Sequence, residues 1–155
     1  TYYHPLGGKF VGAAHAHINY ADGYGGDKLP AFERFFMGGS TSLRGFNIKD
    51  VGPKNDDNNP IGGNQSLLFN LEVQYPFTKA FRGFLFYDRG NIYGGGFNTS
   101  TTSNSFDLGE MRSSIGAGLR FISPFGPLGL AYGIKLDQKS GEEAAEFHFS
   151  AGSAF

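Results

Sequence analysis

The sequence has 155 residues, of which 39% are hydrophobic, 16% aromatic and 17% charged, so it is long enough for about one domain. Its 13 Lys and Arg nearly balance its 14 Asp and Glu, which leaves no basic field for a nucleic-acid backbone. The absence of cysteine excludes a disulfide framework, a thiolate zinc site and a cysteine nucleophile.

The longest apolar stretch without a charge runs over 121–134 and contains two prolines. A membrane-spanning helix needs about 20 apolar residues, so no transmembrane helix is predicted. The first residues also lack the basic start and the apolar run of a secretory signal. We therefore expect either a mature chain or a part of a longer one.

Apolar residues alternate with polar or small residues in one segment after another, which predicts β-strands. Residues 1–6 are predicted to be the tail of a preceding strand, which enters a tight turn at 6–8. Each full strand has about ten residues, close to the 9–11 tilted residues that cross a hydrocarbon layer. The six predicted strands cover 10–20, 66–75, 81–90, 111–121, 128–137 and 145–155.

The predicted connections alternate between long and short. They cover 22–65, 76–80, 91–110, 123–127 and 138–144. Outer-membrane barrels have this asymmetry, with short periplasmic turns and long extracellular loops. A soluble sandwich or a lipocalin-like barrel has the same strand period and remains an alternative, although neither architecture requires the asymmetry.

The alternation also predicts which side of each strand meets lipid. The even positions of 128–136 and the odd positions of 145–155, Ser153 apart, form apolar faces. Aromatic residues fall at or near strand ends, as in an interfacial girdle, although aromatic residues favour strands in general. These aromatic residues are Tyr20, Tyr24, Tyr75, Phe77, Phe121, Phe125, Tyr132 and Phe155.

Six strands are too few to close a membrane barrel, because the smallest such barrels have eight. An open edge in lipid would leave backbone groups without hydrogen-bond partners. Further strands are therefore expected from upstream sequence or from a second chain. The expected fold is an all-β, antiparallel transmembrane β-barrel to which residues 1–155 contribute about six strands.

Several runs of residues resemble motifs of one family, in the order in which the family has them. Together they are similar to the sixth extracellular loop and two strand motifs of the BamA family of outer-membrane insertases. The resemblance covers essentially the whole chain, aligned with the last third of a 16-stranded barrel. The TamA family shares parts of it, and the Gly-Pro-Lys run favours BamA. The matching runs are Phe36 to Ser40, Leu43-Arg44-Gly45-Phe46, Val51-Gly52-Pro53-Lys54, Phe86 to Gly90, and Gly118 to Leu128.

The resemblance implies a role for the tetrapeptide 43–46. In the family this loop folds back into the lumen, where Arg44 would bridge Glu72 and Asp88 with its planar fork. The alternation is compatible with this arrangement, because Glu72 lies on the polar side of its strand and Asp88 shares a face with Phe86. Without the resemblance, Arg44 reads as an ordinary solvated loop residue.

The end of the chain resembles the C-terminal signal by which outer-membrane proteins are recognised for insertion. Phe147 and Phe149 alternate with polar residues towards the terminal Phe155. Gly152 would be a weak point in this seam strand, because glycine has no side chain to pack. A last strand that simply ends in an interfacial aromatic residue is the alternative.

Other clusters carry no recognisable chemistry. His15 and His17 share a strand face, but no third metal ligand follows at suitable spacing. The polar run at 55–59 lacks the calcium-loop pattern, and the glycines at 94–96 precede no helix that could bind phosphate. No nucleophile motif stands out, so no enzyme activity, metal or cofactor is expected.

The expected function is that of the central barrel subunit of the outer-membrane assembly machinery in a Gram-negative bacterium, which folds and inserts other barrel proteins. The implied partners are outer-membrane lipid, unfolded outer-membrane proteins and the machinery's lipoproteins, with no nucleic acid. A transport pore, such as a porin, a two-partner secretion channel or a TamA-like translocase, is the alternative. A purely structural scaffold is a third possibility.

Overall fold

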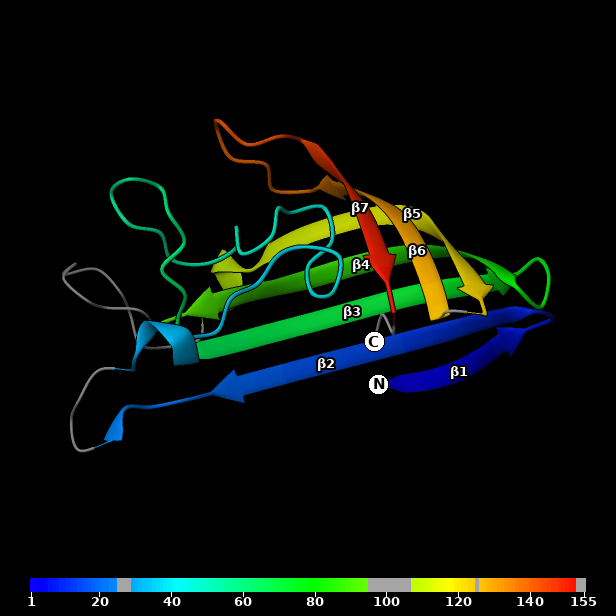
Figure 1. Cartoon of the computed structure of the whole chain (residues 1–155), viewed down its shortest axis with the longest axis horizontal. Coiled ribbons are helices and arrows are strands. Elements are labelled where there is room, and N and C mark those ends of the chain that lie inside the picture. Colours follow the sequence, from blue (N-terminus) through cyan, green and yellow to red (C-terminus); the bar gives the residue numbers. More distant parts are fainter. Residues whose placement is uncertain (25–28, 95–106, 125, 153–155) are drawn as a thin grey trace.

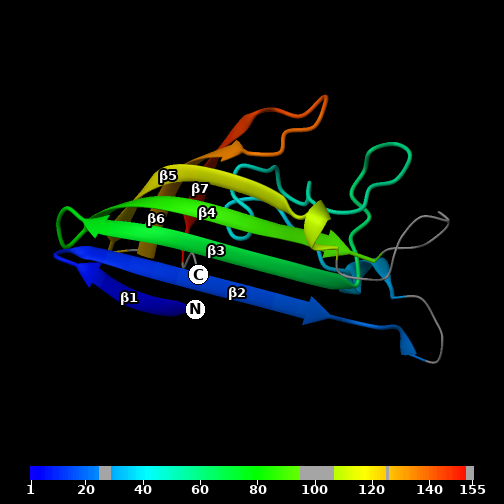
Figure 2. The same ribbon diagram turned by 180° about the vertical axis from the view of Figure 1, so that it is seen from behind.

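The computed structural model describes residues 1–24, 29–94, 107–124 and 126–152, which form one curved antiparallel β-sheet (Figures 1 and 2). Each strand pairs with the next along the chain, so the order is β1 to β7 without a crossover. No helix in these ranges is long and apolar enough to cross a membrane. The strands are β1 (Tyr2–Gly7), β2 (Phe10–Tyr20), β3 (Gln65–Pro76), β4 (Phe81–Tyr93), β5 (Arg112–Ser123), β6 (Gly126–Lys135) and β7 (Ala145–Ala151).

The sheet has seven strands, where the sequence predicted about six. The additional strand is β1, which was expected only as the tail of a strand. It pairs with β2 over most of its length, from Tyr2 opposite Ala14 to Gly7 opposite Phe10. The tight turn between them lies at 8–9, slightly later than the predicted 6–8, because β1 continues to Gly7. Within the described residues β1 and β7 each have a single neighbour, so this chain does not close the sheet.

The connections alternate in length as predicted. The connections between β3 and β4 and between β5 and β6 are short and join the strands at one end of the sheet, whereas the longer connections that follow β2, β4 and β6 begin at the other end. In Figure 1 the cyan part of the first long connection runs back along the sheet instead of extending away from it. This part of the connection therefore lies over the concave side of the sheet.

The two faces of the sheet differ as the alternation predicts. Leu130 and Tyr132 of β6 are exposed on the outer face, whereas Ala131, Gly133 and Lys135 are buried on the inner face. On β7 the side chains of Phe147 and Phe149 are exposed on the outer face, and Phe149 stands directly opposite Leu130. The outer face of β6 and β7 is thus apolar at these positions.

Replacing Leu130 with arginine is expected to lower the free energy of unfolding in lipid vesicles by about 2–4 kcal/mol, because mid-strand positions on this face meet hydrocarbon. Leu128 lies near the end of the same strand, so Leu128→Arg is the matched control and should cost about 0–1 kcal/mol. Denaturant titration of the vesicle-bound protein measures both. A spin label at position 130 that reports water instead of lipid would show that the orientation is wrong.

Aromatic side chains gather at the end of the sheet that carries the short turns. Phe10 packs on Tyr75 with ring centroids 4.9 Å apart, and Tyr75 packs on Phe77 at 5.3 Å. Phe81 and Phe121, on the next pair of strands, are 4.7 Å apart. This row occupies the position of an interfacial girdle. Phe125 and Phe155, also expected there, lie outside the described residues.

One residue breaks the alternation of β3 for a physical reason. Leu68 points to the inner, otherwise polar face, yet it is buried. It packs in a cluster with apolar residues of the long connection and with Ile92 of β4. The loop therefore brings its own small hydrophobic core to the sheet. The buried members of this cluster are Met37, Leu43, Phe46, Val51, Leu68 and Ile92.

Candidate functional site

The tip of the long connection is a tightly closed loop. Met37 and Val51 form a single antiparallel bridge at its base, and the backbone N–H of Gly39 lies 3.0 Å from the carbonyl oxygen of Phe46. Leu43 and Phe46 are fully buried in the apolar cluster. Because these flanking side chains pack into the cluster, the loop presents Arg44 to the inner face of the sheet.

Arg44 bridges two carboxylates from neighbouring strands. Its Nε and Nη2 atoms donate to the two oxygens of Asp88 at 2.7 and 2.8 Å, and its Nη1 donates to Glu72 at 2.7 Å. The backbone N–H of Arg44 donates to Asp88 as well, at 3.1 Å. Arg44 is 2% exposed and Asp88 is 0% exposed. The structure thus brings together the three residues that the resemblance singled out.

A second cation completes the charge balance around Glu72. Arg120 of β5 donates to the second oxygen of Glu72 at 3.1 Å, and Gln74 donates to the same oxygen at 2.7 Å. Two guanidinium groups therefore face two carboxylates, with no net charge left in the cluster. Buried ions are tolerated when they are paired and hydrogen-bonded in this way.

The guanidinium of Arg44 also lies on an aromatic ring. Its central carbon is 3.8 Å from the ring centroid of Phe86, which supplies a cation–π contact in a site shielded from water. Phe86 stands opposite Gly116 of β5, and a side chain at Gly116 would collide with the ring. Gly116 thus leaves room for the ring of Phe86 on which Arg44 rests.

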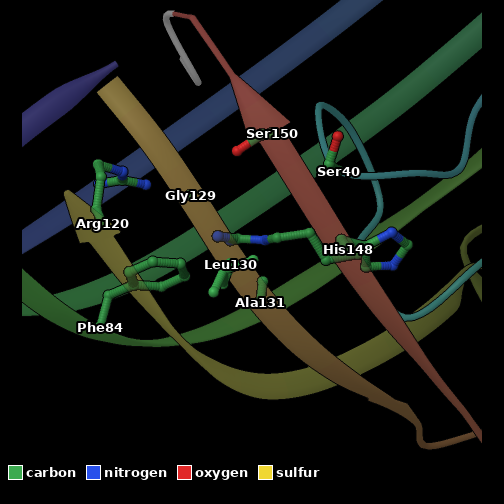
Figure 3. A pocket seen from close by; sticks show the side chains of 9 residues that line it. Ser40, Phe84, Arg120, Gly129, Leu130, Ala131, His148 and Ser150 are labelled. Carbon is green, nitrogen blue, oxygen red and sulfur yellow. The ribbon is translucent and has the colours of Figure 1, made fainter. Parts of the chain in front are cut away.

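The backbone on either side of Arg44 contacts further strands. Ser114 of β5 donates its hydroxyl to the carbonyl oxygen of Arg44. The N–H of Gly45 donates to Nε2 of His148 on β7 at 2.8 Å. Figure 3 shows His148 together with Ser150 of β7 beside a small hollow next to Arg44. The tip of the loop therefore reaches from β3 and β4 across to β7.

The loop backbone also lies close to the sheet at Gly133 of β6. A Cβ atom built on Gly133 would lie 2.6 Å from the nitrogen and 2.7 Å from the Cα of Gly45. Gly45 itself has φ +87°, a conformation that glycine adopts without strain. Gly133 and Ser114 were not proposed as site residues from the sequence. A glycine on the inner face of a strand was the one available signal, because it often marks a close backbone approach.

A second ion cluster lies where the strands meet the long connections. Arg112, the first residue of β5, donates to Asp137 at 3.0 Å and to Glu142 at 2.6 Å. Its guanidinium carbon is 4.7 Å from the ring centroid of Phe46, the last residue of the tetrapeptide. This cluster therefore connects the loop tip to the connection between β6 and β7. The hydrogen bond from Arg112 lowers the pKa of Glu142 from 4.5 to about 2.

This shift predicts how acid affects the connection between β6 and β7. A carboxyl group whose pKa is lower in the folded state adds stability that is present above pH 4.5 and is lost as the pH falls towards 2. The carboxyl carbon of Glu142, followed by NMR, should titrate near pH 2. Replacing Arg112 with glutamine removes the cause and should move the midpoint back towards 4.5. A midpoint already near 4.5 in the unchanged protein would contradict the ion pair.

The residues expected to form the C-terminal signal lie partly within the described part of the chain. Phe147 and Phe149 point outward from β7. Gly152 was expected in the last strand, but β7 ends at Ala151 and Gly152 follows it with φ +99°. Its N–H still donates to the carbonyl oxygen of Pro127 at 2.9 Å, so Gly152 remains bound to β6. Phe155 lies outside the described residues.

Comparison with known proteins gives a consistent result. The model of the Omp85 superfamily domain matches residues 1–155. The chain is similar to the outer membrane protein assembly factor BamA of Nitratidesulfovibrio vulgaris, with 36% identity over 132 residues that cover 82% of this chain and 16% of that protein. It is 28% identical to BamA of Neisseria meningitidis serogroup B over 182 residues, which cover 100% of this chain and 23% of the relative.

A solved structure agrees with these relatives. The crystal structure of BamA from Haemophilus ducreyi lacking POTRA domains 1-3 matches 95% of this chain and 32% of that chain, with a TM-score of 0.78 and 28% identity. The chain spans only 16% and 23% of the length of the two curated relatives.

Proposed function

The chain belongs to the Omp85 superfamily, and from this premise we propose that it forms part of the barrel of an assembly factor that folds and inserts other proteins into the bacterial outer membrane. It lies in the outer membrane as antiparallel strands with an apolar outer face. In the proposed mechanism an incoming strand adds to an exposed strand edge. Unpaired N–H and C=O groups at such an edge are a template for another strand. The chain acts by binding and positioning, without covalent chemistry.

The observation that supports this function best is the anchoring of the long connection inside the sheet. A connection of this length stays ordered only when something holds it, and here the Arg44 contacts hold it. A pore would be expected to keep its lumen open for solutes, whereas this loop covers the inner face of β3 and β4. The anchored tip instead gives the wall of the barrel a fixed shape near β7, which has a single neighbouring strand within the described residues and is the edge at which we propose that strands are added.

The partners follow from the same surfaces. The outer apolar face suits outer-membrane lipid, and a strand edge suits an unfolded outer-membrane protein. The lipoproteins of an assembly machinery would bind elsewhere on the complete protein. The strands needed to close the barrel would come from the rest of the same protein or from a second chain.

The function is tested with the full-length protein that contains this chain, reconstituted in lipid vesicles. Folding of a urea-unfolded outer-membrane barrel protein is followed by its heat-dependent gel mobility. Vesicles with the protein should fold this client faster than empty vesicles of the same lipid. Equal rates in both would contradict the proposal.

Conductance across planar bilayers distinguishes the transport alternative. A porin-like pore should conduct steadily, and its conductance should persist when residues 40–48 are replaced by a short glycine-serine linker. An assembly factor should lose client folding after this replacement. Steady conductance that persists after the replacement, in a protein that folds no client even before it, would favour the pore.

A further inference from the structure

Strand β7 has a single neighbouring strand within the described residues and is held from two sides. On one side it pairs with β6, from Ala145 opposite Ile134 to Ala151 opposite Leu128. On its inner face it is bound by the loop tip, through the hydrogen bond from Gly45 to His148 at 2.8 Å. A second bond of 2.8 Å runs from the side-chain amide of Asn47 to Glu146.

The two hydrogen bonds join residues that are equally spaced along the loop and along β7. His148 and Glu146 are two apart on β7, so both side chains point to the same face of the sheet. Their partners, Gly45 and Asn47, are also two apart in the loop. We call this pair of hydrogen bonds the loop–β7 latch. It belongs to the same loop tip that Arg44 ties to β3 and β4.

The hydrogen bond from Gly45 assigns a defined role to His148. The donor is a backbone N–H, so Nε2 of His148 must accept, and the ring proton sits on Nδ1 in the neutral imidazole. The charged groups around the imidazole are Arg44, Lys135, Asp88 and Glu146. Gly45 cannot easily turn its N–H elsewhere, because its backbone lies against Gly133 and Ser114. An acceptor at position 148 is therefore required to satisfy this donor.

We propose that His148 is a positioning residue that couples the anchored loop to the strand edge on which clients are assembled. The proposal rests on the proposed function. The latch holds β7 in one place relative to β3 and β4, so the edge of β7 that has no neighbour within the described residues is held in a fixed register. A preorganised edge lowers the entropy that an incoming strand must lose when it pairs. Breaking the latch leaves the fold intact and loosens β7.

Two substitutions separate the acceptor from the rest of the side chain. His148→Leu keeps a side chain of similar bulk but removes the acceptor, whereas His148→Gln keeps an acceptor oxygen that can reach Gly45. Ser150→Ala is the matched control, because Ser150 lies two residues along on the same inner face (Figure 3). All three are made in the full-length protein in lipid vesicles.

The first measurement is hydrogen exchange of the peptide 145–151, which does not depend on client assembly. His148→Leu should speed this exchange by about fivefold, the factor expected for the loss of one hydrogen bond. His148→Gln and Ser150→Ala should leave it within about twofold of the unchanged protein. Exchange that is unaffected by His148→Leu, or is raised equally by His148→Gln, overturns the latch. If His148→Leu does not fold, Asn47→Ala is used instead, because it removes the other hydrogen bond of the latch and should also speed the exchange. Unchanged exchange in Asn47→Ala would likewise overturn the latch.

The second measurement is the rate of client folding. It should fall in His148→Leu in proportion to the faster exchange of β7 and recover in His148→Gln. Faster exchange with unchanged client folding would keep the latch but overturn its role in positioning the edge. If the unchanged protein folds no client at all, the proposed function fails, and the exchange data still decide whether the latch exists.

Discussion

Replacing Arg44 with alanine is expected to lower the free energy of unfolding by about 3–5 kcal/mol, because it leaves Glu72 and Asp88 as buried charges without their main partner. The two carboxylates come from adjacent strands and lie on the inner face beneath the loop. Without the guanidinium between them they also repel each other. The loop should detach, and client folding should be lost with it.

Lysine at position 44 is expected to restore little of this stability. An ammonium group is a compact charge and cannot donate in a fork to Asp88 while also reaching Glu72, nor stack flat on Phe86. Lys54→Ala is the matched control, because Lys54 forms an ion pair with Asp50 in the same connection but both side chains are partly exposed. That substitution should cost about 0–1 kcal/mol.

Denaturant titration of the vesicle-bound protein measures these differences, and client folding is followed in parallel. Adding Asp88→Asn to Arg44→Ala should recover part of the lost stability, because one orphan charge is removed. Client folding should not recover, because the loop still lacks its anchor. A cost below that of Lys54→Ala would mean that the ion cluster does not hold the loop.

The strands could be predicted from the sequence because their signal is local. Side chains alternate across a strand with period two, so the outward position of Leu130 and the inward position of Glu72 follow from the pattern alone. The strand β1 was predicted less well, because its residues alternate weakly and the partner that orders it is β2. Leu68 breaks this alternation, and only the loop core that covers it explains why.

The site was only partly predictable. Arg44, Glu72 and Asp88 were identified through the resemblance, since no local pattern connects a loop residue with strands 28 and 44 positions away. His148 was recognised only as a polar residue on the inner face of the last strand. Its contact with Gly45 spans 103 positions and depends on how the whole sheet curves. Such contacts are set by tertiary packing and leave little trace in single residues.

Gly133 illustrates this limit and leads to the second large effect. In the sequence Gly133 is only a small residue on the inner face of β6. Such a residue usually means that the lumen is crowded or that many side chains are accepted at the position. In the structure it is the place where the loop backbone touches the sheet. In an ordinary strand, alanine would be better than glycine, because glycine loses more conformational entropy on folding.

Gly133→Ala is nevertheless expected to be destabilising, by about 1–3 kcal/mol from overpacking, with lost hydrogen bonds in addition. The new methyl group would lie 2.6 Å from the nitrogen of Gly45, so the loop backbone must move away. That movement stretches the bond from Gly45 to His148 and the bonds from Arg44 to Asp88. Client folding should fall together with stability.

Gly129→Ala is the matched control, on the same face of the same strand. Its methyl group would meet only the hydroxyl of Ser150, the end of a side chain that can rotate away, so its effect should stay within about 0.5 kcal/mol. Denaturant titration compares the two. Equal stability of both variants would mean that the loop does not rest on β6.

The decisive comparison combines Gly133→Ala with Arg44→Ala in one protein. Residues that share one structural unit give non-additive effects, and the coupling is measured by a double-mutant cycle. If Arg44→Ala has already detached the loop, no backbone remains above Gly133 for the new methyl group to strike. Gly133→Ala should then cost nothing further, and its better strand entropy should show as a small gain. Simple addition of the two losses would show instead that Arg44 and Gly133 act on separate parts of the barrel, which would contradict the loop position described above.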